Sequence, residues 1–153
     1  MKKKVKIFGY LLIIAFILMQ FYPCDKPMFT NKNPNDLLQN SNVSENVATM
    51  LKSACYDCHS NESNFPWYSN IAPTKWLVYN HISEGREELN FSEWTHLDKD
   101  AKADLLDDIS SVVLDEEMPL KGYTLLHSEA NLSEENRETI ATWADEMLES
   151  LYE

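Results

Sequence analysis

Two cysteines and a histidine stand close together at Cys55, Cys58 and His59, in the string ACYDCHSNES. The chain has only three cysteines and four histidines among its 153 residues, so the grouping is unusual. Three kinds of site use a Cys-x-x-Cys pair: a redox-active dithiol, a structural zinc site and an attachment site for haem c. In the third kind, the thiols add to the two haem vinyl groups and the histidine that follows binds the iron.

The rest of the chain argues against the first two kinds of site. A thioredoxin-like dithiol follows a strand, and a zinc site needs four ligands, whereas no such strand is predicted and the remaining cysteine and histidines are isolated. We therefore predict haem c as the cofactor, linked to Cys55 and Cys58, with His59 as the proximal iron ligand. A backbone carbonyl of Pro66 or Pro73 is expected to fix the tautomer of His59.

The distal iron ligand is predicted to be Met118, in the string DEEMPLKGY. A helix that ends before Met-Pro presents the thioether from a loop stiffened by the proline, and a Met/His pair raises the potential of a c haem. His81, beside the apolar face of a predicted helix, is the alternative. His96, His127 or an open iron position are further possibilities, because an isolated histidine is more often a structural residue than a ligand.

Several aromatic residues and one arginine are weaker candidates for the same site. The string FPWYS, with Trp76, Tyr79, Trp94 and Tyr123, can line a haem crevice or fill an ordinary core. Arg86 can pair with a haem propionate or with a surface glutamate one helical turn away.

The N-terminus reads MKKKVK and continues into an apolar run from Ile7 to Phe21, a pattern typical of an export signal. No small-residue cleavage site follows, so we predict that residues 1–22 remain as an uncleaved signal-anchor helix, with a removed signal peptide as the alternative. This predicts attachment to the cytoplasmic membrane, with the domain in the periplasm, where haem c attachment takes place. The fate of Cys24 stays open, because FYPC is a poor lipoprotein box.

The remaining chain divides into a linker at residues 23–42, rich in Asn and Pro, and a domain at residues 43–153. Helix signals follow Ser44, Pro73, Asp98 and Ser133, and no alternating strand pattern competes with them. The fold class is therefore all-α: about four helices packed around one covalently attached haem, as in cytochrome c, because four short helices alone make a thin core. The inward positions are predicted to be Val47, Met50, Leu51, Ala54, Val78, Ile82, Gly85, Leu89, Ala101, Leu105, Ile109, Val112, Val113, Ile140, Trp143, Ala144, Met147 and Leu151.

Charge limits the possible partners. After residue 22 the chain has nine Lys and Arg against 25 Asp and Glu, a formal charge of −16. Nucleic acid is excluded as a main partner, because binding it requires cationic contacts with phosphate. The acidic surface either keeps the domain soluble or attracts a basic redox protein.

Longer strings resemble the small bacterial haem-binding domain family that is defined around a CxxCH motif. The similar strings are CYDCHSNES, PWYSNIAP, HISEGREELNFSEW and EEMPL, and they extend over about residues 51–143. The resemblance implies a monohaem c-type domain behind an N-terminal anchor, with the haem held at Cys55, Cys58 and His59. We expect one-electron transfer between redox partner proteins at the outer face of the membrane rather than enzymatic activity. A haem-dependent sensor or a peroxidase-like enzyme with an open iron site is the alternative.

Overall fold

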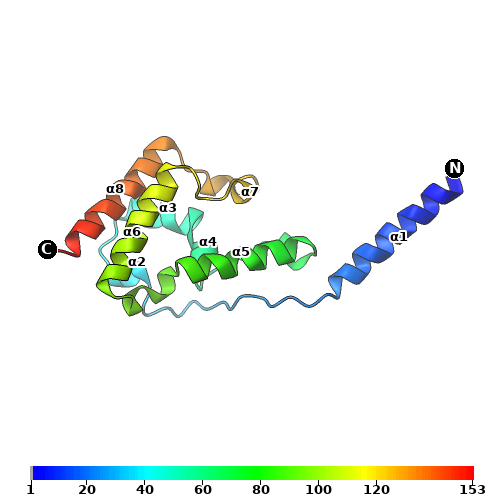
Figure 1. Cartoon of the computed structure of the whole chain (residues 1–153), viewed down its shortest axis with the longest axis horizontal. Helices are drawn as coiled ribbons and strands as arrows, with labels where there is room; N and C mark the ends of the chain where they lie inside the picture. The colour runs from blue at the N-terminus through cyan, green and yellow to red at the C-terminus, as the bar shows by residue number, and fades with distance from the viewer. Residues whose placement is uncertain (1) are drawn as a thin grey trace.

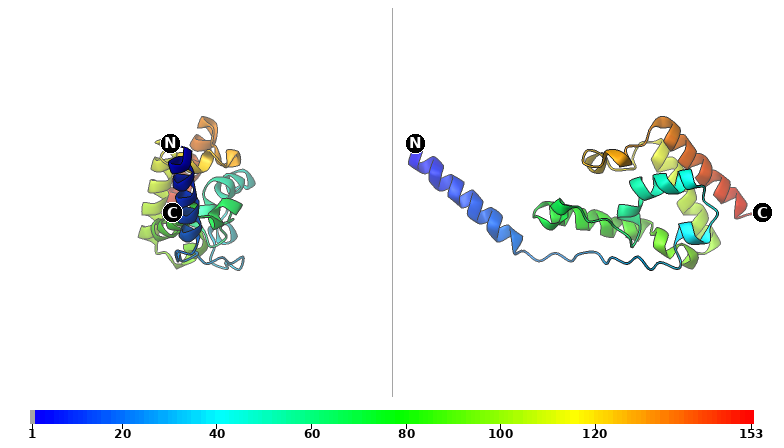
Figure 2. Two further views of the ribbon diagram at one scale, coloured as in Figure 1. Left: turned by 90° about the vertical axis from the view of Figure 1, so that its right-hand side faces the viewer. Right: turned by 180° about the vertical axis from the view of Figure 1, so that it is seen from behind.

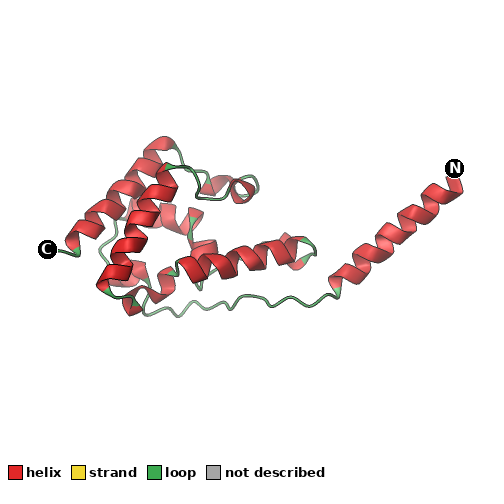
Figure 3. Cartoon of the chain, in the orientation of Figure 1, coloured by secondary structure: helices red, strands yellow, loops and turns green. Residues whose placement is uncertain are grey.

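The computed structural model describes residues 2–153, and this part of the chain is all-helical, with 67% of its residues in helices and no strand (Figure 3). The prediction of an all-α fold is therefore confirmed. In chain order the helices are α1 (Lys2–Gln20), α2 (Leu37–Asn40), α3 (Glu45–Ala54), α4 (Tyr56–His59), α5 (Thr74–Glu88), α6 (Lys99–Leu114), α7 (Lys121–Thr124) and α8 (Glu134–Ser150), with 3₁₀ turns η1 (Trp67–Asn70), η2 (Phe91–His96) and η3 (Ser128–Ala130).

The four predicted helices correspond to α3, α5, α6 and α8, and local capping explains where they begin. The side chains of Ser44, Asp98 and Ser133 each accept a bond from the backbone N–H three residues later, at 3.4, 2.9 and 3.2 Å. These bonds satisfy N–H groups that have no partner inside the helix. Pro73 precedes α5, where its missing N–H and fixed φ cost nothing.

The core lies around the two long helices α6 and α8, which lie side by side in Figure 1. Leu106 on α6 and Ile140 and Ala144 on α8 are fully buried, and α3 packs against α8. Helices α5 and α7 both extend from this body toward the same side, as Figures 1 and 2 show. The other fully or nearly buried apolar residues of this cluster are Leu37, Val47, Met50, Leu51, Ala54, Tyr56, Phe91, Trp94, Ile109, Val113, Ala130, Leu132 and Trp143.

Part of the predicted linker belongs to the folded domain. The short helix α2 lies within residues 23–42, and Asp36 and Leu37 are buried. The backbone N–H of Thr30 also donates to the carbonyl of Asn61 at 2.9 Å. A helix of four residues shows too little apolar periodicity to be recognised in the sequence, which is why this segment resembles a tether.

The prediction of an N-terminal membrane anchor is wrong. In residues 2–153 no helix has both the length and the apolar character that a membrane crossing requires. The predicted anchor, residues 1–22, forms α1 from Lys2 onward, whereas Met1 lies outside the described residues. Four lysines fall in the first five positions of α1, so its uncharged part spans about 21 Å against about 30 Å of hydrocarbon. The predicted localisation at the cytoplasmic membrane, which depended on this anchor, is wrong with it.

Candidate functional site

The Cys-x-x-Cys-His motif lies on α4, a single helical turn that follows α3 directly. Cys55 is both the residue after α3 and the residue before α4. Its carbonyl accepts bonds from the N–H groups of Cys58 at 3.1 Å and His59 at 2.9 Å. Cys58 and His59 follow Cys55 by three and four residues, so each lies about one helical turn from Cys55.

The last turn of α5 packs directly against this motif. A Cβ atom added to Gly85 would lie 3.0 Å from the carbonyl oxygen of Cys58 and 3.3 Å from its Cβ atom. These distances are shorter than ordinary van der Waals contacts, so the missing side chain lets α5 approach α4 closely. The sequence predicts Gly85 on the inward face of its helix, and the contact with Cys58 gives the reason.

The imidazole of His59 is fixed by Leu89, the residue that follows α5. Its Nδ1 atom lies 3.0 Å from the Leu89 carbonyl oxygen. Since a carbonyl can only accept, Nδ1 carries the proton and Nε2 keeps a free lone pair, the usual state of a metal-binding histidine. Burial lowers the pKa of His59 and so favours the neutral ring. The predicted carbonyl of Pro66 or Pro73 is wrong, because Leu89 takes this role.

Arg86, also on the last turn of α5, joins three segments around the motif. Its Nε atom donates to the carbonyl of Ser60 at 2.8 Å, Nη1 to the carbonyl of Met28 at 2.8 Å and Nη2 to Ser63 Oγ at 2.9 Å. Each of the three nitrogens therefore has one partner within the protein, and Arg86 holds the residue after His59 in place. The ion pairs among residues 2–153 include no pair of Arg86 with a glutamate, and its contact with a haem propionate stays a prediction.

The chemistry of the two thiols also separates the possible kinds of site. Burial, reinforced by the neighbouring thiol, raises the pKa of Cys55 to about 12, and burial with the nearby Asp57 raises the pKa of Cys58 to about 11. A redox-active Cys-x-x-Cys pair needs a lowered thiol pKa instead. In the described residues no group of three or more His, Cys, Asp or Glu is placed to hold a metal ion.

A polar cluster beside the motif connects it to the segment around α7. The Tyr123 hydroxyl donates to Asp57 Oδ2 at 2.8 Å, and Asp57 Oδ1 accepts from the Asn64 N–H at 2.9 Å. The Tyr68 hydroxyl lies 2.6 Å from His127 Nε2, and the His127 ring stacks on Tyr123 with centroids 4.2 Å apart. Asp57, the residue between the two cysteines, was not singled out in the sequence, although its place inside the motif is a signal that could have found it.

The candidate distal ligand Met118 lies half-buried in the loop between α6 and α7. Its N–H donates to the Val112 carbonyl at 3.0 Å, and its own carbonyl accepts from Arg137 Nη1 at 2.7 Å. The backbone of Met118 is thus fixed on both sides. Its role as an iron ligand stays a prediction.

The other histidines differ in how free their rings are. Both ring nitrogens of His96 and of His127 already face hydrogen-bonding side chains. His81 is half-buried on α5, one turn before Gly85. Because residues four apart share one helix face, His81 lies on the face of α5 that meets Cys58 and stays the alternative ligand.

The aromatic candidates divide between site and core. Tyr123 lies beside the motif, as does Tyr68 of the string FPWYS. Trp94 is buried in the core, Tyr79 packs on the edge of Phe65, and Trp76 lies against the N-terminal segment. Aromatic residue type alone does not distinguish these environments.

Large apolar side chains stand exposed on the segments that surround the motif. Trp67 on η1 is 77% exposed, Leu125 at the end of α7 is 83% exposed, and Leu77 on α5 is also exposed. Large exposed side chains of this kind are suited to contact with an apolar partner or ligand. A porphyrin is a large, mostly apolar plane and would cover surface of this kind.

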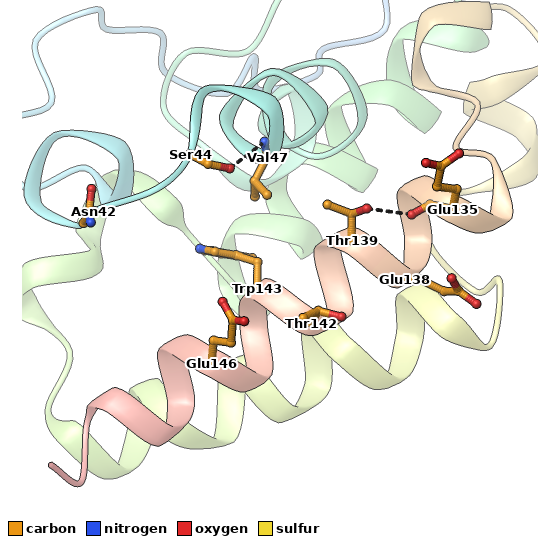
Figure 4. Close-up of a pocket in the computed structure, with 9 residues that line it drawn as sticks. All are labelled: Asn42, Ser44, Val47, Glu135, Glu138, Thr139, Thr142, Trp143 and Glu146. Carbon is orange, nitrogen blue, oxygen red and sulfur yellow. Dashed lines mark hydrogen bonds between the residues drawn. The ribbon is translucent and has the colours of Figure 1, made fainter.

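Two hollows of the protein surface lie away from the motif. The larger, of about 560 Å³, lies between the start of α3 and α8, and its lining includes Trp143, Glu135, Glu138 and Glu146 (Figure 4). The smaller lies between the end of α6 and the start of α8. Neither of these two hollows is lined by a residue of the motif.

Residues 14–146 match the family described as the haem-binding domain. The chain belongs to the haem-binding domain family. This membership, which covers most of the chain, supports haem as the cofactor and haem binding as the function. Neither a curated protein nor a solved structure matches the chain. Within this haem-binding domain, Cys55, Cys58 and His59 are all half-buried and offer two thiols and one imidazole, groups that can hold a haem.

Proposed function

We propose that this haem-binding domain carries haem c, with thioether bonds to Cys55 and Cys58 and with His59 Nε2 on the iron. The observation that supports this most is the 3.0 Å bond from His59 Nδ1 to the Leu89 carbonyl, which leaves the Nε2 lone pair free. Each thiol would add across one vinyl double bond, its sulfur joining one carbon and its hydrogen the other. No oxidant is needed for this addition.

We further propose that Met118 is the distal ligand, with His81 as the alternative. Met118 is only five residues before Tyr123, whose hydroxyl is bonded to Asp57 inside the motif. Five residues span at most about 18 Å, so this bond keeps Met118 near α4. The fixed backbone of Met118 fits a ligand that must be presented in one direction.

With both axial positions filled by protein side chains, the working function is electron transfer. The haem iron supplies one-electron chemistry, changing between its ferric and ferrous states. His59 and Met118 would leave no coordination position for a substrate, and the aromatic residues beside the motif would limit contact with water. The formal charge of −12 favours redox partner proteins with basic surfaces, so the association rate should fall as salt rises.

The attachment is tested with the full chain, produced in a host that matures c-type cytochromes. Cys55→Ala or Cys58→Ala should weaken the haem stain that survives denaturing electrophoresis, because each removes one thioether bond, and replacing both cysteines should abolish it. Cys24→Ala is the matched control and should keep the stain, since Cys24 is a free cysteine outside the motif. Haem that extracts into acidified acetone while all cysteines are intact would refute covalent attachment.

The distal ligand is tested by optical spectroscopy of the oxidised and reduced haem protein. A sulfur–iron bond gives a weak near-infrared charge-transfer band, which should be present in the natural protein and absent in Met118→Ala. Met147→Ala, a half-buried methionine of α8, is the matched control and should keep the band. Absence of the band together with rapid carbon monoxide uptake would refute Met118 as ligand and favour a sensor or peroxidase-like enzyme with an open iron site.

A further inference from the structure

The chain has only two arginines, Arg86 and Arg137, and both are bonded to backbone carbonyls beside the proposed iron ligands. Arg86 donates to the carbonyl of Ser60, the residue after His59. Arg137 donates to the carbonyl of Met118 itself. The ion pairs among residues 2–153 involve neither arginine. Because neither partly buried guanidinium makes an ion pair, its bonds to backbone carbonyls are the interactions that hold it in place.

The position of Arg137 is unfavourable for its charge. It is the fourth residue of α8, within the first turn, where the helix dipole disfavours a cation. Its Nη1 atom nevertheless donates to two carbonyls, that of Val113 at 2.8 Å and that of Met118 at 2.7 Å. Val113 lies in the last turn of α6, and its carbonyl also accepts a bond from the Glu116 N–H at 3.3 Å. One nitrogen therefore connects the end of α6, the start of α8 and the loop that carries Met118.

The backbone of Met118 is fixed on its other side as well. The carbonyl of Val112 accepts bonds from the N–H groups of both Glu117 and Met118, each at 3.0 Å. The turn passes through Glu116, whose φ of 57° is the one positive φ among the described non-glycine residues. A methionine side chain has three rotatable bonds, so a fixed backbone is what limits where its sulfur can reach.

We propose that Arg137 is a positioning residue for Met118, holding the backbone of the loop where the thioether meets the iron. The inference rests on the proposed function, because it assumes that Met118 is the distal ligand. Without the two bonds from Arg137, the Met118 carbonyl and the end of α6 are no longer held by the same side chain. The loop would then sample positions in which the sulfur leaves the iron.

The test compares four variants of the full haem-loaded chain: Arg137→Met, Arg137→Lys, Ile140→Val and Met118→Ala. Arg137→Met keeps the length of the side chain without its donors, whereas Arg137→Lys keeps the charge and two or more N–H donors. Ile140→Val is the matched control, because Ile140 is fully buried on the same helix and its truncation destabilises the domain without touching Met118. The readouts are the near-infrared band, the rate of carbon monoxide uptake by the reduced protein and thermal stability.

We expect Arg137→Met to weaken the band and to speed carbon monoxide uptake by about tenfold, the effect of losing the charge-assisted hydrogen bond to the Met118 carbonyl. Arg137→Lys should restore most of the band, and Ile140→Val should leave band and rate unchanged despite a lower melting temperature. If Met118→Ala abolishes the band but Arg137→Met changes only stability, Arg137 is structural and the inference is overturned. If Met118→Ala leaves the spectrum unchanged, Met118 is not the ligand, and the proposed coordination fails together with this inference.

Discussion

The α6–α8 pair and the α4–α5 pair are held together in different ways. Between the long helices α6 and α8, burial of apolar side chains such as Leu106 and Ile140 provides the attraction. Between α4 and α5, one glycine contact and a few hydrogen bonds, including those of Arg86 and the Leu89 carbonyl, fix a helix of only four residues. Burial is strong but non-directional, whereas hydrogen bonds and close contacts define orientation.

The difference assigns separate tasks to the two pairs. The α6–α8 pair supplies stability, which depends on apolar area and tolerates changes that conserve volume. The α4–α5 pair supplies geometry, because the direction of the His59 ring depends on the position of one carbonyl. Substitutions in the first pair should therefore lower stability and leave the haem spectrum intact, whereas those in the second should alter the spectrum.

The largest effect on stability is expected for Leu106→Ala. Leu106 is fully buried on α6, so its truncation leaves a cavity and should lower the free energy of unfolding by about 2–5 kcal/mol. Denaturant unfolding of the haem-loaded chain measures this loss. The absorption spectrum of the folded protein should not change, because Leu106 belongs to the pair that supplies stability.

Leu114→Ala is the control for this substitution, because Leu114 lies on the same helix and is half exposed. Its effect should stay within about 0.5 kcal/mol. A changed haem spectrum in Leu106→Ala, with the protein fully folded, would contradict the separation of the two helix pairs.

The four longer helices of the domain and many of their buried residues were predicted well from the sequence. Cap residues and apolar spacing located α3, α5, α6 and α8, and the predicted inward residues Val47, Ile109 and Ile140 are buried. Leu106 was missed in favour of its neighbour Leu105, which is half-buried, because adjacent leucines fit the helical period almost equally well.

The geometry around the motif was less predictable, for a physical reason. A CxxCH string is visible in the sequence because it uses rare residue types at fixed spacing. The groups that hold the motif in place lie about 30 residues further along the chain. They are the backbone carbonyl of Leu89 and the missing side chain of Gly85. Every residue has a carbonyl, so Pro66 and Pro73 could not be distinguished from Leu89 before the fold was known.

An intermediate effect is expected for Gly85→Ala, which tests the α4–α5 pair directly. Alanine gains about 1 kcal/mol of helix propensity, but its Cβ atom would meet the Cys58 carbonyl at 3.0 Å. Overpacking of this kind costs about 1–3 kcal/mol, so the net loss of stability should be small while α4 and the His59 ring shift. The haem absorption spectrum and the melting temperature measure the two effects separately.

Gly122→Ala is the matched control, because Gly122 lies on the short helix α7 and a Cβ atom there meets nothing within 4 Å. It should leave the spectrum unchanged and stability unchanged or slightly higher. An unaltered spectrum in Gly85→Ala would show that the motif does not depend on the close approach of α5.

The smallest effect is expected for Asp36→Asn, where a carboxyl group lies inside the apolar cluster and bonds to the motif. Asp36 Oδ1 accepts from the Leu38 N–H at 2.9 Å and from the Tyr56 hydroxyl at 3.0 Å, whereas Oδ2 has no partner. Burial raises the pKa of Asp36. Its stabilising contribution is therefore complete below the unfolded pKa, near 3.8, and is lost as pH rises through the folded pKa.

An amide at position 36 keeps the acceptor for Leu38 and Tyr56 but cannot ionise. Asp36→Asn should therefore be more stable than the natural protein at pH 7, by about 1 kcal/mol, and should lose this advantage toward pH 4. Urea midpoints at the two pH values measure the difference, and Asp98→Asn, at the exposed cap of α6, should show no such gain. A variant less stable than the natural protein at pH 7 would mean that the charge of Asp36 stabilises α2 and Tyr56, and that polar bonds support the core as well as the motif.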